Sequence, residues 1–352
     1  MPSRSIAWLR SNPWRGATIV LTIALVGLLA LYLTRRDPGT GSEDEDPGAI
    51  VTTTAPVGSG SPGPSTTMGD GGPSPSGEGF LAVKVDNAPS ARPQVGINSA
   101  SLLVEVPVEG GMTRFVAVFA AGASGLVGPI RSLRPVDADL LPPLAVQVVS
   151  TGGQPFVVQA VDSSGIDIVD PTIFSLFVSG GRQVPSDTFL DLEVLMPLIE
   201  GTPPEGKGLP SGVLPSSSES ASTLALPLGG VELRLEDGVY ARYQDGEPYQ
   251  VLDTLDGPMS VLAHETVVVM FVAERPAGYQ DSNGAEVPTF DVIGGGRLLV
   301  AHNGQLVRGT WSRTARADPF VFRDLAGEPF GLPVGSTYLA MVPRDMNVEV
   351  GP

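Results

Sequence analysis

The stretch SLLVEVPVEGGMTRFVAVFA (101–120) decides what kind of fold this chain can form. Two apolar runs with alternating side chains flank Gly110–Gly111, a pair that suits a tight turn because glycine tolerates positive φ. The pattern predicts a β-hairpin with a two-residue turn. Alternate residues of a strand point to opposite faces. One face of the first strand therefore carries Val104, Val106 and Val108.

Charged side chains interrupt this apolar hairpin. Glu105 and Glu109 share the face opposite the valines, and a two-residue turn places Arg114 diagonal to both of them. Along an extended strand the two glutamates are about 13–14 Å apart. That exceeds the separation of roughly 5–9.5 Å between the paired carboxyl groups of glycosidases. A hydrolase built on Glu105, Glu109 and a third carboxylate, Asp86, is therefore an alternative hypothesis only.

The segments around the hairpin mix short strands with short helices. FLAVKVD (80–86) reads as a strand that ends in the turn pair Asp86–Asn87, and 144–150 reads as another strand. The spacing of apolar residues predicts helices over 136–141, 155–164 and 187–200, the last with Asp187 near its N-cap. The expected fold class is therefore a mixed α/β or α+β module.

A change in composition separates two parts of this module. Residues 206–222 are rich in Gly, Pro and Ser and are expected to form a flexible loop between an N-terminal domain (80–205) and a C-terminal domain (223–352). The second part is strand-rich. It contains Asn303–Gly304, a strong signal for a two-residue hairpin turn.

The N-terminal region predicts a membrane anchor. GATIVLTIALVGLLALYL (16–33) is 18 residues long and uncharged, about 27 Å as a helix and close to the ~30 Å hydrocarbon core. Three arginines precede it, which predicts a cytoplasmic segment 1–15, a single transmembrane helix 16–34 and an extracytoplasmic remainder. A cleaved signal peptide is the alternative. Residues 35–79, rich in Pro, Gly, Ser and Thr and acidic, are expected to form a disordered linker.

Composition excludes several classes of function. The chain of 352 residues has a formal net charge of −17, and a body this acidic repels a phosphate backbone, so nucleic acid is excluded as a partner. It has no cysteine, which excludes disulfides, thiolate nucleophiles and cysteine-based metal sites.

Four segments resemble one bacterial family. DNAPSARPQ (86–94), VEVPVEGGMTRFVAVF (104–119), VGPIRSLRP (127–135) and GTWSRTARADPFVFRDLAGEPFGLPVGSTYLAMVP (309–343) are similar to the YerB-like family, whose two halves are known as DUF3048. The resemblance implies a two-part extracytoplasmic module and no established reaction. Its members are mostly lipoproteins, whereas this chain has the predicted helix in place of a lipid-bearing cysteine. Ser186 and Asp187 stand where relatives usually carry a His-Asn pair.

Catalytic motifs are missing from the sequence. It contains no G-x-S-x-G elbow, S-x-x-K pair, H-E-x-x-H helix or phosphate-binding loop. His264 and His302 are its two histidines, and each lies in a predicted strand. We therefore expect no metal and no cofactor, and the sequence favours a binding protein over an enzyme.

The basic residues of the N-terminal domain gather in its first part. Arg92, Arg114, Arg131 and Arg134 share 80–140 with five acidic residues. They either pair with these acids to hold Pro-rich loops or form a binding site, where forked guanidinium groups take carboxylates or phosphates. The candidate ligand-binding residues are Asp86, Asn87, Arg92, Glu105, Glu109, Arg114, Arg131 and Arg134.

The hypothesis from sequence is recognition of a cell-envelope component at the membrane, either peptidoglycan or another anionic polymer. A carboxylate-dependent glycan hydrolase and a protein-interaction scaffold at the membrane are the alternatives. The sequence does not identify a protein partner.

Overall fold

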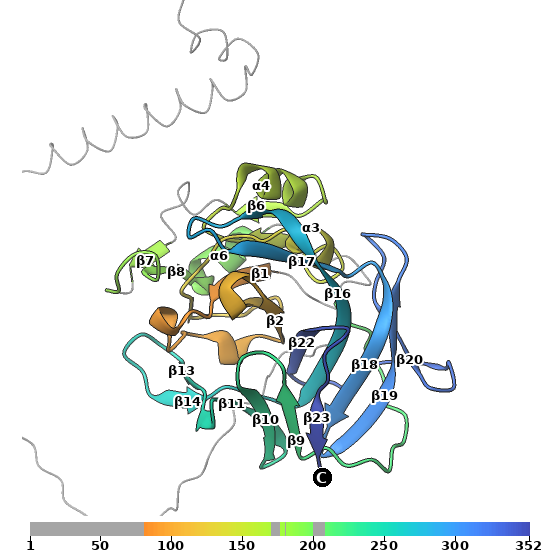
Figure 1. The fold of residues 1–352 in the computed structure, drawn as a ribbon. Helices are drawn as coiled ribbons and strands as arrows, with labels where there is room; N and C mark the ends of the chain where they lie inside the picture. The colour runs from red at the N-terminus through yellow and green to blue at the C-terminus, as the bar shows by residue number, and fades with distance from the viewer. Residues whose placement is uncertain (1–80, 170–176, 180, 200–207) are drawn as a thin grey trace, which may run out of the picture. The chain divides into compact units, whose positions relative to one another are not determined.

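The computed structural model describes residues 81–169, 177–179, 181–199 and 208–352, all of which belong to one compact unit, Thr67–Pro352 (Figure 1). The expected cytoplasmic segment 1–15, transmembrane helix 16–34 and linker 35–79 lie outside the described residues. Within the described ranges, no helix has the length and apolar character needed to cross a bilayer.

Twelve strands of the described chain form the main sheet. Its N-terminal strands are β1 (Leu81–Asp86), β2 (Leu102–Pro107), β3 (Thr113–Phe119), β5 (Gln147–Val149) and β6 (Asp167–Val169). Its C-terminal strands are β16 (Thr266–Gln280), β17 (Glu286–Asp291), β18 (Gly294–His302), β19 (Gln305–Arg313), β20 (Val321–Asp324), β21 (Pro329–Phe330) and β22 (Thr337–Pro343). Strand β22 runs parallel to β2 on one side and to β16 on the other, so one sheet joins strands from both sides of residues 206–222.

The remaining described elements are smaller. A six-stranded sheet contains β9 (Thr223–Leu226), β10 (Val231–Glu236), β11 (Val239–Gln244), β12 (Glu247–Pro248), β15 (Ala263–His264) and β23 (Glu349–Gly351). Strands β13 (Gln250–Leu252) and β14 (Met259–Val261) pair, as do β4 (Leu126–Val127), β8 (Thr188–Asp191) and β7 (Phe177–Ser179). The helices are α3 (Asp137–Leu140), α4 (Pro155–Asp162) and α6 (Leu192–Leu195), with 3-10 turns η1 (Pro89–Ala91), η2 (Ile97–Ser99), η3 (Glu109–Gly111) and η4 (Met196–Leu198).

The central strands β1, β2, β3 and β22 of the main sheet bury both faces, because their alternate residues enter different apolar clusters. Leu103 and Phe115 pack in a cluster with Leu233 and Tyr240 of the six-stranded sheet. Val104 and its neighbours on the other face pack in a cluster with residues of α3 and α4. Figure 1 shows α3 and α4 gathered near β6, and β18, β19 and β20 side by side at another part of the body.

The expected mixed α/β or α+β fold class is wrong, because the described chain is built mainly of strands. The predicted helix 187–200 shows the physical reason. Its first part is β8, which pairs antiparallel with β4 and β7 and buries both Phe189 and Leu190. Among the described residues of this range only Leu192–Leu195 forms an α-helix, which the 3-10 turn η4 follows. Asp191 rather than Asp187 caps the α-helix and accepts a hydrogen bond from Glu193 N at 2.9 Å. Tertiary strand pairing has overridden local helical spacing.

Other local predictions are confirmed. Strand β1 covers Leu81–Asp86, and α4 covers Pro155–Asp162 within the predicted 155–164. The β18–β19 hairpin turns at Asn303 and Gly304, both with positive φ of 48° and 76°. These are the backbone angles for which that residue pair is favoured.

Candidate functional site

The β2–β3 hairpin, which carries Glu105, Glu109 and Arg114, has a longer turn than predicted. Val108 N donates to Met112 O at 2.8 Å, and between them Gly110 and Gly111 both have left-handed φ, 71° and 70°. Arg114 therefore pairs with Val106, whereas a two-residue turn would pair it with Pro107. A shift of one residue turns a side chain to the other face of the sheet. The predicted position of Arg114 on the same face as Glu105 is therefore wrong, whereas Arg114 does lie near Glu109.

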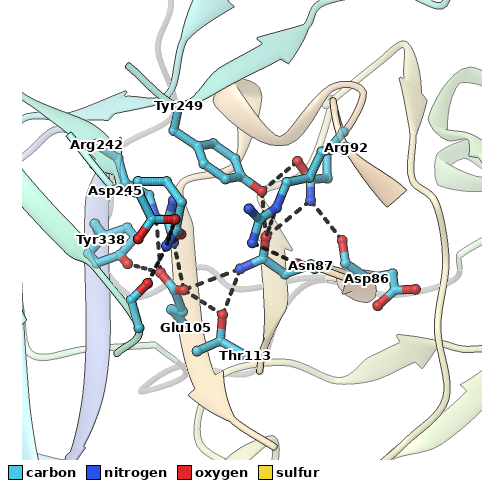
Figure 2. A network of polar contacts seen from close by, with 12 residues as sticks. Asp86, Asn87, Arg92, Glu105, Thr113, Arg242, Asp245, Tyr249 and Tyr338 are labelled. Atoms are coloured by element: carbon cyan, nitrogen blue, oxygen red, sulfur yellow. Dashed lines mark hydrogen bonds and ion pairs between the residues drawn. The ribbon is translucent and has the colours of Figure 1, made fainter. Parts of the chain in front are cut away.

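Glu105 lies at the centre of a buried polar network (Figure 2). Its carboxylate is fully buried and accepts from Arg242 Nε at 3.1 Å and Arg242 Nη2 at 2.8 Å. Asn87 Nδ2 donates at 3.2 Å, Thr113 Oγ1 at 2.5 Å, and the Tyr338 hydroxyl also donates. A carboxylate has about four lone-pair sites, so five donors leave no free position for a ligand.

Opposite charge decides the protonation of this network. Burial raises the pKa of Glu105, but the charge and hydrogen bonds of Arg242 outweigh it, and the pKa of Glu105 lies below its usual value. Burial lowers the pKa of Arg242, and Glu105 raises it further than burial lowers it. Both groups are therefore ionised, and each is the counter-charge of the other.

Asn87 and Arg92 belong to the same network. Arg92 Nε donates to Asn87 Oδ1 at 3.2 Å, and its guanidinium lies 5.2 Å from the centre of the Tyr249 ring. The Tyr249 hydroxyl donates to Asn87 and, at 2.9 Å, to Gln94. We call the set the Glu105 network: Asn87, Arg92, Gln94, Glu105, Thr113, Arg242, Tyr249 and Tyr338.

The opposite face of the hairpin carries a second polar group, around a cavity of about 430 Å³. Figure 2 shows the Asp86 carboxylate pointing away from Glu105. We call this space the arginine cavity. Its charged lining residues are Asp86, Glu109, Arg114, Arg131, Arg134 and Asp281. The structure thus divides the predicted binding residues into two sets and places Glu105 in the set away from Asp86 and Glu109.

Ion pairs order the arginine cavity. Arg134 Nε donates to Glu109 Oε2 at 2.8 Å, and its Nη2 contacts the other carboxylate oxygen. Arg131 Nε lies 3.0 Å from Asp86 Oδ2. Arg114 Nη2 lies 3.8 Å from Glu109 Oε1, while Nη1 donates to the Ser132 carbonyl at 3.0 Å. All three arginines therefore have partners, as the pairing hypothesis predicts, and all three also line the cavity.

The exposed fractions of the three arginines differ. The side chains of Arg114, Arg134 and Arg131 are 5%, 15% and 28% exposed. Burial, followed by repulsion from Arg134, lowers the pKa of Arg114 to about 10. Its buried Nε has no hydrogen-bond partner among the described residues. Arg114 therefore keeps one buried guanidinium donor, in the wall of the cavity, without a partner among these residues.

The carboxylate of Glu109 does not have the character of a catalytic acid. Burial raises its pKa, but the hydrogen bonds and charge of Arg134 outweigh this and lower the pKa below the usual value. A general acid of a glycosidase needs a raised pKa. The two histidines lie apart from the cavity. His264 is buried in contact with the Tyr338 ring, and His302 Nδ1 lies 3.0 Å from Thr266 Oγ1. The described part of the chain contains no group of three His, Cys, Asp or Glu side chains placed to hold a metal ion.

A buried pair beneath the cavity positions Arg134. Lys84 Nζ lies 2.8 Å from Asp137 Oδ1, and both side chains are fully buried. The other oxygen of Asp137 accepts from the backbone N of Arg134 at 2.6 Å. Asp137, one of the five acids counted in the sequence, thus fixes the backbone from which Arg134 reaches Glu109.

Sequence reasoning missed five members of the Glu105 network: Gln94, Thr113, Arg242, Tyr249 and Tyr338. One signal was present for Arg242. The alternation of VYARYQ (239–244) places it on the same strand face as Tyr240, so a charged side chain was directed toward the core. Nothing local indicates its partner, which is 137 residues earlier in the chain.

Comparison with known proteins agrees with this architecture. Two family models match the chain: the DUF3048 N-terminal domain over residues 71–203 and the DUF3048 C-terminal domain over 232–339, each described as a protein of unknown function. The chain belongs to the YerB-like DUF3048 family. The Glu105 network therefore connects the two halves of a YerB-like protein, since Glu105 lies in the first match and Arg242 in the second.

Two comparisons, one of sequence and one of structure, show how far the likeness to YerB of Bacillus subtilis extends. A Bacillus subtilis (strain 168) protein, YerB, whose name calls it a lipoprotein, is 46% identical over 54 residues, 15% of this chain and only 16% of that protein. The crystal structure of the YerB protein from Bacillus subtilis matches with a TM-score of 0.63 and 21% identity, covering 78% of this chain and 94% of that one. The structural match shows a shared fold.

Proposed function

We propose that this YerB-like protein is tethered to the cell membrane, faces the outside of the cell and binds an anionic envelope polymer in the arginine cavity. The uncharged run 16–33 supports the tether, and the lipoprotein name of the Bacillus relative supports the same topology by a different attachment.

The arginine cavity carries the proposal. Three guanidinium groups line a polar space of about 430 Å³ in a protein whose formal net charge is −17. A planar guanidinium matches the geometry of a carboxylate or a phosphate. Arg131 is the most exposed of the three, and its ion-pair partner among the described residues is Asp86. It is therefore the group best placed to exchange a protein carboxylate for a ligand anion.

The experiment is a sedimentation assay with the full chain in detergent and insoluble peptidoglycan sacculi. We expect the protein in the pellet, and Arg131→Ala to weaken the binding about tenfold, as for a lost charge-assisted hydrogen bond of roughly 1.5 kcal/mol. Arg323→Ala is the matched control, since Arg323 is exposed on β20 and contacts the Gly327 carbonyl. Equal binding by the wild type and the Arg131 variant would contradict the site.

Two further arms of the assay separate the ligand classes and the alternatives. Sacculi stripped of phosphate polymers by hydrofluoric acid still bind if the ligand is peptidoglycan, and lose binding if it is a phosphate polymer. Mass spectrometry of the supernatant detects a hydrolase by released fragments. Protein that stays in solution with every preparation favours the scaffold alternative and overturns the binding proposal.

A further inference from the structure

A second, larger cavity lies next to the arginine cavity. It has a volume of about 820 Å³ and shares two lining residues, Glu109 and Met112, with the arginine cavity. Five prolines line it, and we call it the proline groove: Pro107, Pro227, Pro276, Pro288 and Pro343. The turn between β2 and β3 thus contributes walls to both spaces.

The turn between the two cavities carries no side chain at Gly110 and Gly111. Gly110 and Gly111 line the proline groove without side chains, and a Cβ atom built on Gly111 would meet no atom within 4 Å. Gly229, from the β9–β10 turn, lines the same groove. A chain molecule longer than one sugar or one amino acid can therefore lie across the turn and occupy both cavities.

The charged residues that line the two cavities differ: acidic residues outnumber basic ones in the proline groove, whereas three arginines and three carboxylates line the arginine cavity. Glu274, Glu286 and Asp345 line the proline groove, are exposed, and make no ion pair with any described residue. Arg275 is paired with Asp291 at 2.7 Å, which leaves Arg344 as the remaining basic lining residue. The groove is therefore suited to an ammonium group, whereas in the arginine cavity the partly exposed guanidinium of Arg131 is suited to an anion.

The rest of the groove wall is apolar. Met112 and Met346 are 39% and 41% exposed, and they lie with Leu228 and the prolines in its lining. Thioether and pyrrolidine surfaces offer contact area to the aliphatic part of a ligand. An amine on a short aliphatic stem matches this combination of acidic and apolar walls.

We propose that the proline groove and the arginine cavity are one extended site for a wall peptide that carries both a free amine and a carboxylate, as peptidoglycan stem peptides do. The amine lies among Glu274, Glu286 and Asp345, and the carboxylate lies at Arg131. This inference rests on the proposed function and adds to it the second binding subsite and the class of ligand.

The test uses sacculi stripped of phosphate polymers, with their amines either free or acetylated, and the full chain in detergent. Acetylation removes the positive charge of the amine and leaves the carboxylates. We expect it to weaken binding of the wild type about three- to tenfold, the range for one or two partly exposed ion pairs. The double variant Glu274→Gln, Glu286→Gln is expected to bind both preparations equally, at the level of the wild type on acetylated sacculi.

Glu328→Gln is the matched control, because Glu328 is exposed at the β20–β21 turn and makes no ion pair with the described residues. It should retain the wild-type preference for free amines. If acetylation has no effect while Arg131→Ala still weakens binding, the extended site is overturned and the proposed function stands. If the double variant keeps the preference, the assignment of the amine to this groove is overturned. If no preparation binds, both proposals fall.

Discussion

Glu105 is the residue on which the buried polar contacts of the two halves converge. Removing one partner of a buried ion pair leaves the other charge without compensation, and this typically costs about 3–5 kcal/mol. We predict a loss of that size in the free energy of unfolding for Glu105→Gln, because Arg242 is 1% exposed and has no other acid within ion-pair distance among the described residues. Urea titration followed by circular dichroism measures it.

The control for this prediction is the same substitution in a surface pair. Glu232 and Arg234 are 2.7 Å apart, with side chains 30% and 34% exposed. Surface pairs contribute about 0–1 kcal/mol, so Glu232→Gln should change the free energy of unfolding by no more than that. Equal losses in the two variants would show that the Glu105 network does not hold the halves together.

The buried ring of His264 makes the free energy of unfolding depend on pH. Burial lowers its pKa to about 3, whereas an unfolded histidine titrates near 6.5. Between these values the unfolded chain binds more protons, so the stabilising effect of the neutral ring is complete above pH 6.5 and declines as the pH falls. We predict a loss of about 2 kcal/mol from pH 7 to pH 5 by this linkage.

His264→Phe is the variant that isolates this effect. It keeps an aromatic ring next to Tyr338 and removes the titrating group. The free energy of unfolding of this variant should change much less between pH 7 and pH 5, as measured by urea titration at each pH. A variant with the same slope as the wild type would assign the pH dependence to other groups.

At the scale of elements, the alternation of apolar residues predicted where strands occur, but it predicted less well where a strand or a turn begins and ends. Strand β1 and the β18–β19 hairpin follow from alternation and from Asn303–Gly304. The β2–β3 turn did not, because Gly110–Gly111 suits both a two-residue turn and the 3-10 turn that forms. That one-residue difference changed the predicted neighbours of Arg114. This difference places Glu105 and Arg114, which the sequence analysis had grouped in one site, on opposite faces of the hairpin.

Contacts between distant elements could not be predicted from the sequence. Residues 187–200 have helical spacing, yet their first part forms β8, which pairs with β7 and with β4, a strand much earlier in the chain. The side chains that complete the Glu105 network come from β11 and β22. The local pattern indicated which side chains were buried and gave no information about which of them meet.

At the scale of the whole molecule, the two matched halves are joined by backbone and by charge. Strand β22 lies between β2 and β16, and Arg242 pairs with Glu105 across the same region. Neither half can bury its share of the main sheet without the other, since β22 hydrogen-bonds to β2 of the first half and its residues Tyr338 and Ala340 belong to the cluster that contains Leu103.

We therefore predict that the described body unfolds as one cooperative unit. Calorimetry of the full chain in detergent should show a single transition for it, with equal calorimetric and van't Hoff enthalpies. Glu105→Gln should move this whole transition to lower temperature, because the lost ion pair belongs to both halves. Two separate transitions, or a shift in only one part of the signal, would mean that the halves are independent and that the shared sheet does not couple them.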